Sequence, residues 1–116
     1  MTIRCKRAYE PAIPEDGYRA LVDRLWPRGV TKKSADIYIW LKEIAPSDNL
    51  RQWFSHDPQK WQEFKRRYRE ELKEPVKSAI LEQVKKLAKE DTITLLFAAK
   101  EEEYNNALAL KDILAG

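Results

Sequence analysis

The sequence is poor in the residues that build the best-known catalytic and metal sites. Among 116 residues there is one cysteine, Cys5, and one histidine, His56. One cysteine excludes a disulfide within the chain and a zinc site of several cysteines, and one histidine excludes any site that needs two. A serine or cysteine nucleophile activated by histidine can form only through His56. Chemistry must therefore rest mainly on carboxylate, guanidinium, amine, phenol and amide groups, and the sequence indicates no cofactor and no metal.

Glycine and long apolar runs are also scarce. The chain has three glycines and six prolines, and 43% of its residues are hydrophobic while 35% are charged. This balance excludes a collagen-like chain and a disordered tail, because it supplies enough apolar material for one core. No apolar run approaches the length of a membrane span, and the first seven residues carry charge where a signal peptide is apolar. We expect one domain over residues 1–116, located in the cytoplasm, with Cys5 as a reduced thiol and no membrane partner.

The net charge of +3 is unevenly distributed. Residues 1–33 carry eight basic and four acidic side chains, and residues 58–77 carry seven and four, whereas the two remaining segments each have a net charge of −2. Two basic blocks favour an anionic partner, either a small anionic ligand or nucleic acid. The sequence leaves the oligomeric state open.

Strand patterns occur near both ends of the chain. Residues 2–8 alternate in the manner of a strand, and residues 19–25 predict a buried strand. The best strand pattern lies at residues 92–99, which are apolar on both faces like a central parallel strand. Residues 36–44 are compatible with either a strand or a helix.

Helix start signals divide the rest of the chain into helical segments. Ser47 is a good N-cap, Asp57 followed by Pro58 is a second start signal, and Pro75 begins a third apolar stripe. The acidic residues 101–103 suit the start of a last helix. The order of strand, strand, mixed segment, helices, strand and helix is typical of an α/β fold. We expect a mostly parallel sheet of about four strands with helices packed on it.

Ligands of such sheets usually bind beyond the carboxyl ends of the strands, which here points first to residues 23–29. Their sequence, Asp-Arg-Leu-Trp-Pro-Arg-Gly, holds a carboxylate, two guanidiniums and an indole. Arg24 and Arg28 can hold phosphate or carboxylate in a bidentate manner, and Trp26 can stack on a flat ligand. The alternative interpretation is an ion pair that braces a turn, with Trp26 in the core, and for Trp26 that alternative is favoured.

The same rule points to residues 100–106. Lys100 follows the most buried strand and can bind an anion or act as an amine nucleophile. Tyr104, Asn105 and Asn106 are expected in the first helical turn, where phenol and amide groups can face the same crevice. Capping alone also explains asparagine at a helix start.

Three other features have simpler explanations. His56 is the natural candidate for acid/base work, although a lone histidine beside a helix cap is more often structural. Cys5 lies within a strand and is expected to behave as a small buried hydrophobe. The basic run at residues 65–69 resembles a nucleic-acid patch, but glutamates at i,i+4 spacing, such as Glu63 before Arg67, favour an ordinary exposed helix.

Taken together, the strings resemble the family called domain of unknown function 488, in its short YeaO-like branch. The resemblance covers nearly the whole chain and implies a small three-layer α/β domain and a site rather than a reaction. The residues that carry it are Gly17-Tyr18-Arg19, Val22-Asp23-Arg24-Leu25-Trp26-Pro27-Arg28-Gly29-Val30, Trp40-Leu41-Lys42, Ile44-Ala45-Pro46-Ser47, Leu50-Arg51, Trp53-Phe54, His56-Asp57-Pro58, Trp61, Phe64, Arg67-Tyr68, Leu72, Thr94-Leu95-Leu96, Ala98-Ala99-Lys100 and Asn105.

The resemblance also identifies residues. Asp23, Pro27 and Arg28 match the Asp, Pro and Arg that the wider family tends to carry after its second strand. The YeaO-like branch often has His-Asn-His where this chain has Tyr104, Asn105 and Asn106, so only the asparagine at 105 carries over. The departure argues against a mechanism in which those histidines act as acids, bases or metal ligands.

Our leading hypothesis is an anion-accepting crevice for a nucleotide, nucleic acid or small acid. In it Asp23, Arg24 and Arg28 meet Lys100 and Asn105, with Asp23 as acid or base, Lys100 as the second catalytic residue and Asn105 orienting the substrate. The alternative is a non-catalytic module that binds nucleic acid through the basic face of the helix at 58–73. A third hypothesis is a scaffold without a ligand.

Overall fold

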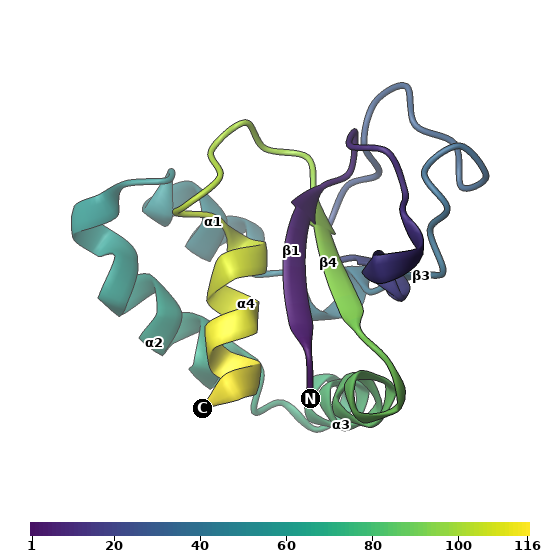
Figure 1. Ribbon diagram of the computed structural model, residues 1–116. Helices are drawn as coiled ribbons and strands as arrows, with labels where there is room; N and C mark the ends of the chain where they lie inside the picture. The colour runs from purple at the N-terminus through teal and green to yellow at the C-terminus, as the bar shows by residue number, and fades with distance from the viewer.

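Four short strands form a parallel sheet in the order β1-β4-β2-β3 (Figure 1). The computed structural model describes residues 1–116. The strands are β1 (Ile3–Arg7), β2 (Tyr18–Leu21), β3 (Ile39–Trp40) and β4 (Ile93–Phe97), the helices are α1 (Asp48–Phe54), α2 (Trp61–Glu71), α3 (Pro75–Glu90) and α4 (Asn106–Ala115), and the 3-10 turns are η1 (Pro14–Asp16), η2 (Lys42–Ile44) and η3 (Pro58–Lys60). The predicted α/β fold with a sheet of four parallel strands is confirmed.

The central strand is β4, in which every residue is buried. It pairs with β1 on one side, where Cys5 lies opposite Leu95, and with β2 on the other, where Ala20 lies opposite the same leucine. A strand that is covered on both faces and both edges has no solvated position. This burial explains why β4 is largely apolar, which is the pattern that predicts a central parallel strand from the sequence.

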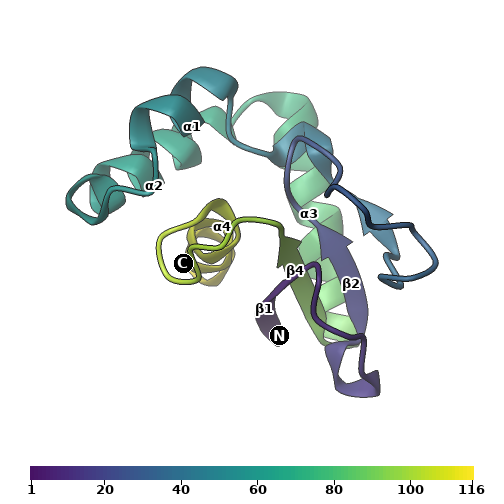
Figure 2. The same ribbon diagram turned by 90° about the horizontal axis from the view of Figure 1, so that it is seen from above.

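The two faces of the sheet are covered differently. Seen from above, α4, α1 and α2 lie on one side, and the segment between β2 and β3 lies on the other (Figure 2). On the helical side the main core contains 19 buried residues. On the opposite side an extended connection, rather than an α-helix, buries Ala35 and Ile37 against Leu21 and Leu96. The layer on this face therefore consists of a loop held in place by apolar contacts.

The helix starts at Ser47, Asp57 and Pro75 are where the sequence predicts them. The Ser47 Oγ accepts a hydrogen bond from the Leu50 N–H at 3.1 Å, which caps α1. Asp57 caps η3, which leads directly into α2, and α3 begins with Pro75 in its first turn. No helix in the structure is long and apolar enough to cross a membrane.

Two boundaries differ from the prediction. The last helix begins at Asn106 and not at the acidic residues 101–103, because the Asn105 side chain accepts the Leu108 N–H and sets the start. Strand β2 ends at Leu21 rather than at residue 25. Residues 36–44, which are compatible with strand or helix on sequence alone, contain both β3 and η2.

A buried ion pair fixes the face of the sheet that carries no helix. The Arg19 Nη1 lies 2.7 Å from the Asp16 Oδ2, and both side chains are almost completely buried. The Arg19 Nε also donates to the Ala35 carbonyl at 2.7 Å, and the Lys6 Nζ reaches Asp16 at 3.0 Å. Burial by itself raises the pKa of Asp16, but the hydrogen bonds from Lys6, the Ile13 N–H and Arg19 outweigh it and lower the pKa.

We expect substitution of Gly17 by alanine to destabilise the fold by about 2–5 kcal/mol, combining backbone strain with overpacking. Gly17 has φ +61° just before β2, and a Cβ there would lie 2.0 Å from the Thr92 carbonyl oxygen. Gly29 is the matched control, because it also has a positive φ (+76°), but a Cβ added there would meet no atom within 4 Å beyond its own chain neighbours. Urea unfolding of both variants measures the difference, and equal losses would contradict the steric argument.

Asp16→Asn is expected to lower the free energy of unfolding by about 3–5 kcal/mol near neutral pH, because it leaves Arg19 without its buried counterion. The pKa of Asp16 is lower in the folded state, so its stabilisation is present above the unfolded pKa and is lost as the pH falls through the folded one. The difference in the free energy of unfolding between wild type and variant therefore becomes smaller at acid pH. Glu82→Gln, which alters the exposed pair with Lys85, serves as the control and shows no comparable gap.

Candidate functional site

A cleft opens beyond the carboxyl ends of β2 and β4. It has a volume of about 540 Å³ and lies between the loop after β2, the segment 45–56 and the segment after β4. Small-molecule sites typically occupy about 300–1,000 Å³. The position agrees with the general rule for parallel sheets, which also directed the sequence prediction to these strand ends.

Asp23 lies half-buried in this cleft and joins its two sides. Its Oδ2 accepts a hydrogen bond from the Ala98 N–H at 2.9 Å, and its Oδ1 accepts one from the Asn106 Nδ2 at 3.1 Å. Burial raises the pKa of Asp23 above its ordinary value, and the two hydrogen bonds with the charges of His56 and Arg51 oppose this only in part. The carboxylate is therefore positioned by the chain on both oxygens.

Asn106, and not Asn105, is the asparagine of the cleft. Its Nδ2 donates to the Val22 carbonyl at 3.0 Å as well as to Asp23. Asn105 is completely buried, donates to the Glu101 carbonyl at 2.8 Å and accepts the Leu108 N–H at 3.0 Å. The side chain of Asn105, which the sequence analysis assigns to ligand binding, is thus used to cap α4. Adjacent residues at a helix start point in different directions, and no sequence signal distinguishes which of two neighbouring asparagines is the cap.

Two arginines from separate elements meet at the mouth of the cleft. The Arg24 Nε lies 3.4 Å, and the Arg51 Nη2 3.7 Å, from the same Asp48 Oδ1. All three side chains are exposed by more than two-fifths. The Arg24 Nη2 also donates to the Pro46 carbonyl at 3.3 Å. Sequence reasoning named Arg24 as a site residue but missed Arg51, which follows no strand. The sequence places Arg51 on a helix capped by Ser47 and among the residues of the family resemblance, but gives it no role.

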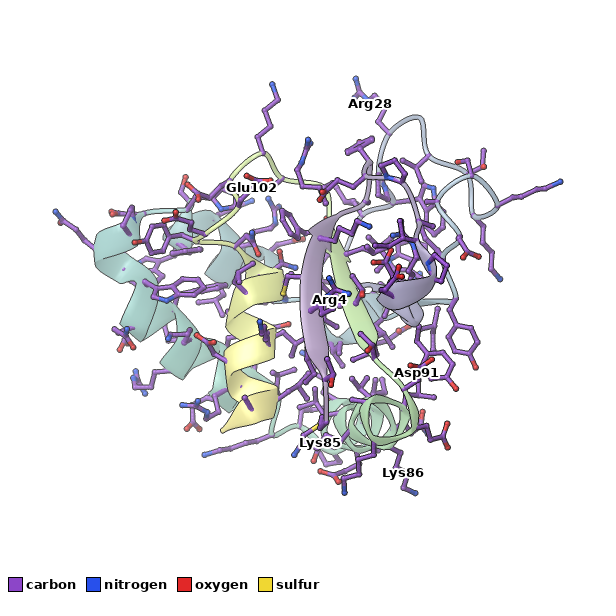
Figure 3. All side chains as sticks on the ribbon, in the orientation of Figure 1. Arg4, Arg28, Lys85, Lys86, Asp91 and Glu102 are labelled. Carbon is purple, nitrogen blue, oxygen red and sulfur yellow. The ribbon has the colours of Figure 1, made fainter.

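Arg28 also lines the cleft, whereas Lys100 does not. The loop that carries Arg28 is held by a hydrogen bond from the Tyr9 Oη to the Arg28 carbonyl at 3.1 Å. Its side chain is exposed and points away from the body of the protein at the tip of the loop (Figure 3). Lys100 is exposed on the segment after β4. The sequence predicts that Arg28 and Lys100 face each other in one crevice, but only Arg28 lines the cleft.

Trp26 packs against the smaller core, as the favoured interpretation predicts, and it also lines the cleft. Its indole packs edge-on against Trp40, with ring centroids 5.2 Å apart, and contributes to the smaller core. It also lines the cleft beside Pro27, across the loop from Phe54 and Pro46. The cleft thus has flat apolar walls between its polar groups.

His56 lies in the cleft and Tyr104 outside it. The His56 Nδ1 is 2.8 Å from the Tyr104 carbonyl oxygen, which can only accept, so Nδ1 donates in this hydrogen bond. The Tyr104 ring packs edge-on against Trp61, with centroids 5.5 Å apart. The aromatic ring predicted to bind ligand is therefore part of the packing between α2 and the segment before α4.

Cys5 is half-buried and packs against the main core, so the expectation of a small buried hydrophobe is met in part. Its thiol donates to the Ala107 carbonyl at 3.5 Å, and burial raises the pKa of the thiol to about 11. A thiol with so high a pKa is protonated near neutral pH and is a poor nucleophile. The structure contains no group of three or more His, Cys, Asp or Glu side chains arranged to hold a metal ion.

The basic face of α2 is largely engaged within the protein. Glu63 lies 2.7 Å from Arg66 and 2.8 Å from Arg67, and these hydrogen bonds lower the pKa of Glu63 to about 2. The expected i,i+4 pair between Glu63 and Arg67 is thus present. Glu71, at the end of α2, binds Ser47 at the start of α1. Its carboxylate accepts from the Ser47 N–H at 2.9 Å and from the Ser47 hydroxyl at 2.5 Å, which links the two helices.

Comparison with known proteins agrees with the resemblance read from the sequence. A family model described as "Inactive DUF488-N3 subclade" matches residues 2–116. The uncharacterised protein YeaO of Escherichia coli K12 is 42% identical over 114 residues, which cover 98% of this chain and 97% of that protein. An uncharacterised protein of Mycobacterium tuberculosis H37Rv is 40% identical over 114 residues, covering 98% and 94%. No solved structure matches the chain. The chain belongs to the DUF488 family, as a YeaO-like member of the subclade described as inactive.

Proposed function

We propose that this chain is a binding protein whose cleft holds a small anionic molecule without converting it. The observation that carries the proposal is the convergence of Arg24 and Arg51, from separate elements, on one carboxylate oxygen of Asp48 at the mouth of the cleft. Arginine presents planar donors that match phosphate and carboxylate groups. An anionic ligand at this point would meet two guanidiniums that are already close together.

The exposure of Asp48 supports this proposal. Its side chain is 62% exposed, and ion pairs in such surroundings contribute little to stability. The arginines are therefore not held by a strong internal partner. Three arginines, Arg24, Arg28 and Arg51, are among the residues that line the cleft, against the two carboxylates of Asp23 and Asp48.

Binding rather than chemistry is favoured by the state of the other groups. Both oxygens of Asp23 accept hydrogen bonds from the chain, which suits a positioning role better than proton transfer. Lys100, the second residue of the catalytic hypothesis, is outside the lining of the cleft. The word "inactive" in the description of the subclade points the same way.

The ligand classes that suit this cleft are a nucleotide or a small acid, as flat apolar walls accompany the cations. Nucleic acid held on the outer face of α2 is less favoured, because Arg66 and Arg67 are paired with Glu63. A phosphorylated metabolite is a cytoplasmic ligand, and the cytoplasm is also the compartment in which a lone thiol such as Cys5 stays reduced.

We expect Arg51→Ala to weaken the binding of ribose 5-phosphate about tenfold or more, since a hydrogen bond to a charged group contributes about 1.5–3 kcal/mol. Asp48→Asn is expected to strengthen binding, because it removes the carboxylate that competes for both arginines. Isothermal titration calorimetry at low salt measures both effects.

Arg66→Ala is the matched control for this experiment. It removes the same charge from an exposed helix and leaves the cleft intact, so the affinity for ribose 5-phosphate should not change. An equal loss in Arg51→Ala and Arg66→Ala would mean that the net charge of the protein, and not the cleft, attracts the anion. Failure of the wild type to bind any phosphate compound would overturn the proposed function.

A further inference from the structure

The floor of the cleft offers hydrogen-bond acceptors, in contrast to the donors at its mouth. From this arrangement we infer that the ligand is a nucleoside monophosphate whose base carries an amino group, with the amino group at Asp23 and Asn106 and the phosphate at Arg24 and Arg51. The inference rests on the proposed function and narrows it to one class of ligand.

The acceptors follow from a count of hydrogen bonds. Asn106 uses both amide hydrogens, one on the Val22 carbonyl and one on the Asp23 Oδ1, so its Oδ1 can act only as an acceptor. No buried polar side-chain atom in the protein lacks a partner, and this oxygen accepts no hydrogen bond from the chain, so solvent or a ligand can reach it. A ligand that binds here must bring donors.

Asp23 adds acceptor capacity beside Asn106. Each of its oxygens accepts one hydrogen bond from the chain, and a carboxylate oxygen has two lone-pair sites. An amino group is the donor best suited to this pair, because it has two hydrogens for two neighbouring acceptors. A ligand that presents only acceptor oxygens, such as those of carbonyl or carboxylate groups, to the floor would instead face repulsion.

The walls select the part of the ligand that lies between its two ends. Trp26 and Pro27 come from the loop after β2, and Pro46 and Phe54 from the other side of the cleft. Planar rings stack favourably on such side chains, with about 1–3 kcal/mol per nucleobase in other proteins. The cleft volume of about 540 Å³ accommodates a ring, a sugar and a phosphate together.

The arginines at the mouth of the cleft suit the phosphate end of the ligand. Arg24 and Arg51 both form ion pairs with the Asp48 Oδ1, and a phosphate would offer three oxygens in its place. Asp23 and Asn106 line the same cleft as Arg24 and Arg51, so the floor and the mouth belong to one site. Donors at one end and acceptors at the other define a ligand with two chemically different ends.

The experiment compares nucleotides of matched shape by isothermal titration calorimetry on the full chain. AMP is paired with purine riboside 5′-monophosphate and CMP with pyrimidin-2-one riboside 5′-monophosphate; each second member lacks only the amino group. Ribose 5-phosphate tests the charged end alone. We expect at least one amino-bearing nucleotide to bind about tenfold or more tightly than its partner, as one charged hydrogen bond implies.

Asp23→Asn tests the floor from the side of the protein. We expect it to abolish the advantage of the amino-bearing nucleotide and to leave the affinity for its partner within about twofold, since only the former donates to this carboxylate. Thermal denaturation reports whether the variant folds. If it does not, Asn106→Ser, which keeps a small polar side chain, replaces it, and the comparison of paired nucleotides on the wild type remains decisive.

The outcomes separate this inference from the proposed function. If both nucleotides of each pair bind equally, or if ribose 5-phosphate binds as tightly as AMP and CMP, the inference is overturned and the anion-binding proposal stands. If no phosphate compound binds, both are overturned. An advantage of the amino-bearing nucleotide that survives Asp23→Asn in a folded variant also contradicts the inference, because the amino group would then lie elsewhere.

Discussion

The Asp23 carboxylate joins the loop after β2 to two points of the segment from β4 to α4, which is remote from that loop in the sequence. One oxygen binds the backbone just after β4, and the other binds the first residue of α4, so the loop after β2 is fixed to both. These two bonds add to the backbone bond from the Val22 N–H to the Leu96 carbonyl and to the bond from Asn106 to the Val22 carbonyl, which join the same segments. Burial of this carboxyl group opposes its ionisation, as the raised pKa indicates. A charged group kept at such a position at the expense of stability is typical of functional clefts.

The resemblance to the YeaO-like branch gives this anchor a further meaning. Where members of that branch often carry histidine, this chain has Tyr104 and Asn106. The structure places Asn106 against Asp23 and places the ring of Tyr104 against Trp61, so only the first of these replacements lies in the cleft. An amide in contact with Asp23 preserves a hydrogen bond but cannot exchange a proton near neutral pH. This difference agrees with the description of the subclade as inactive.

Features that depend on local chemistry were predictable from the sequence, whereas those that depend on the relative placement of elements were not. The apolar run of β4 and the cap at Ser47 each follow from a short stretch of residues, and the edge of the sheet that carries the cleft follows from the parallel α/β order. Arg51, in contrast, reaches the cleft because α1 packs beside the loop after β2, and no motif announces that packing. Asn105 and Asn106 have different roles because the first caps α4 and the second begins it. Lys100 follows the central strand, as predicted, yet its side chain does not line the cleft.

The bonds from Ser47 to Glu71 have a mechanical consequence. Helix α1 has seven residues, too few to be stable alone, so its orientation depends on what it is attached to. The Glu71 carboxylate accepts hydrogen bonds from the backbone N–H and the hydroxyl of Ser47 and thereby couples α1 to the far end of α2. The orientation of α1, and with it the position of Arg51, is therefore tied to the position of the end of α2. Loosening the C-terminal end of α2, away from the cleft, would therefore displace the Arg51 guanidinium from the mouth of the cleft.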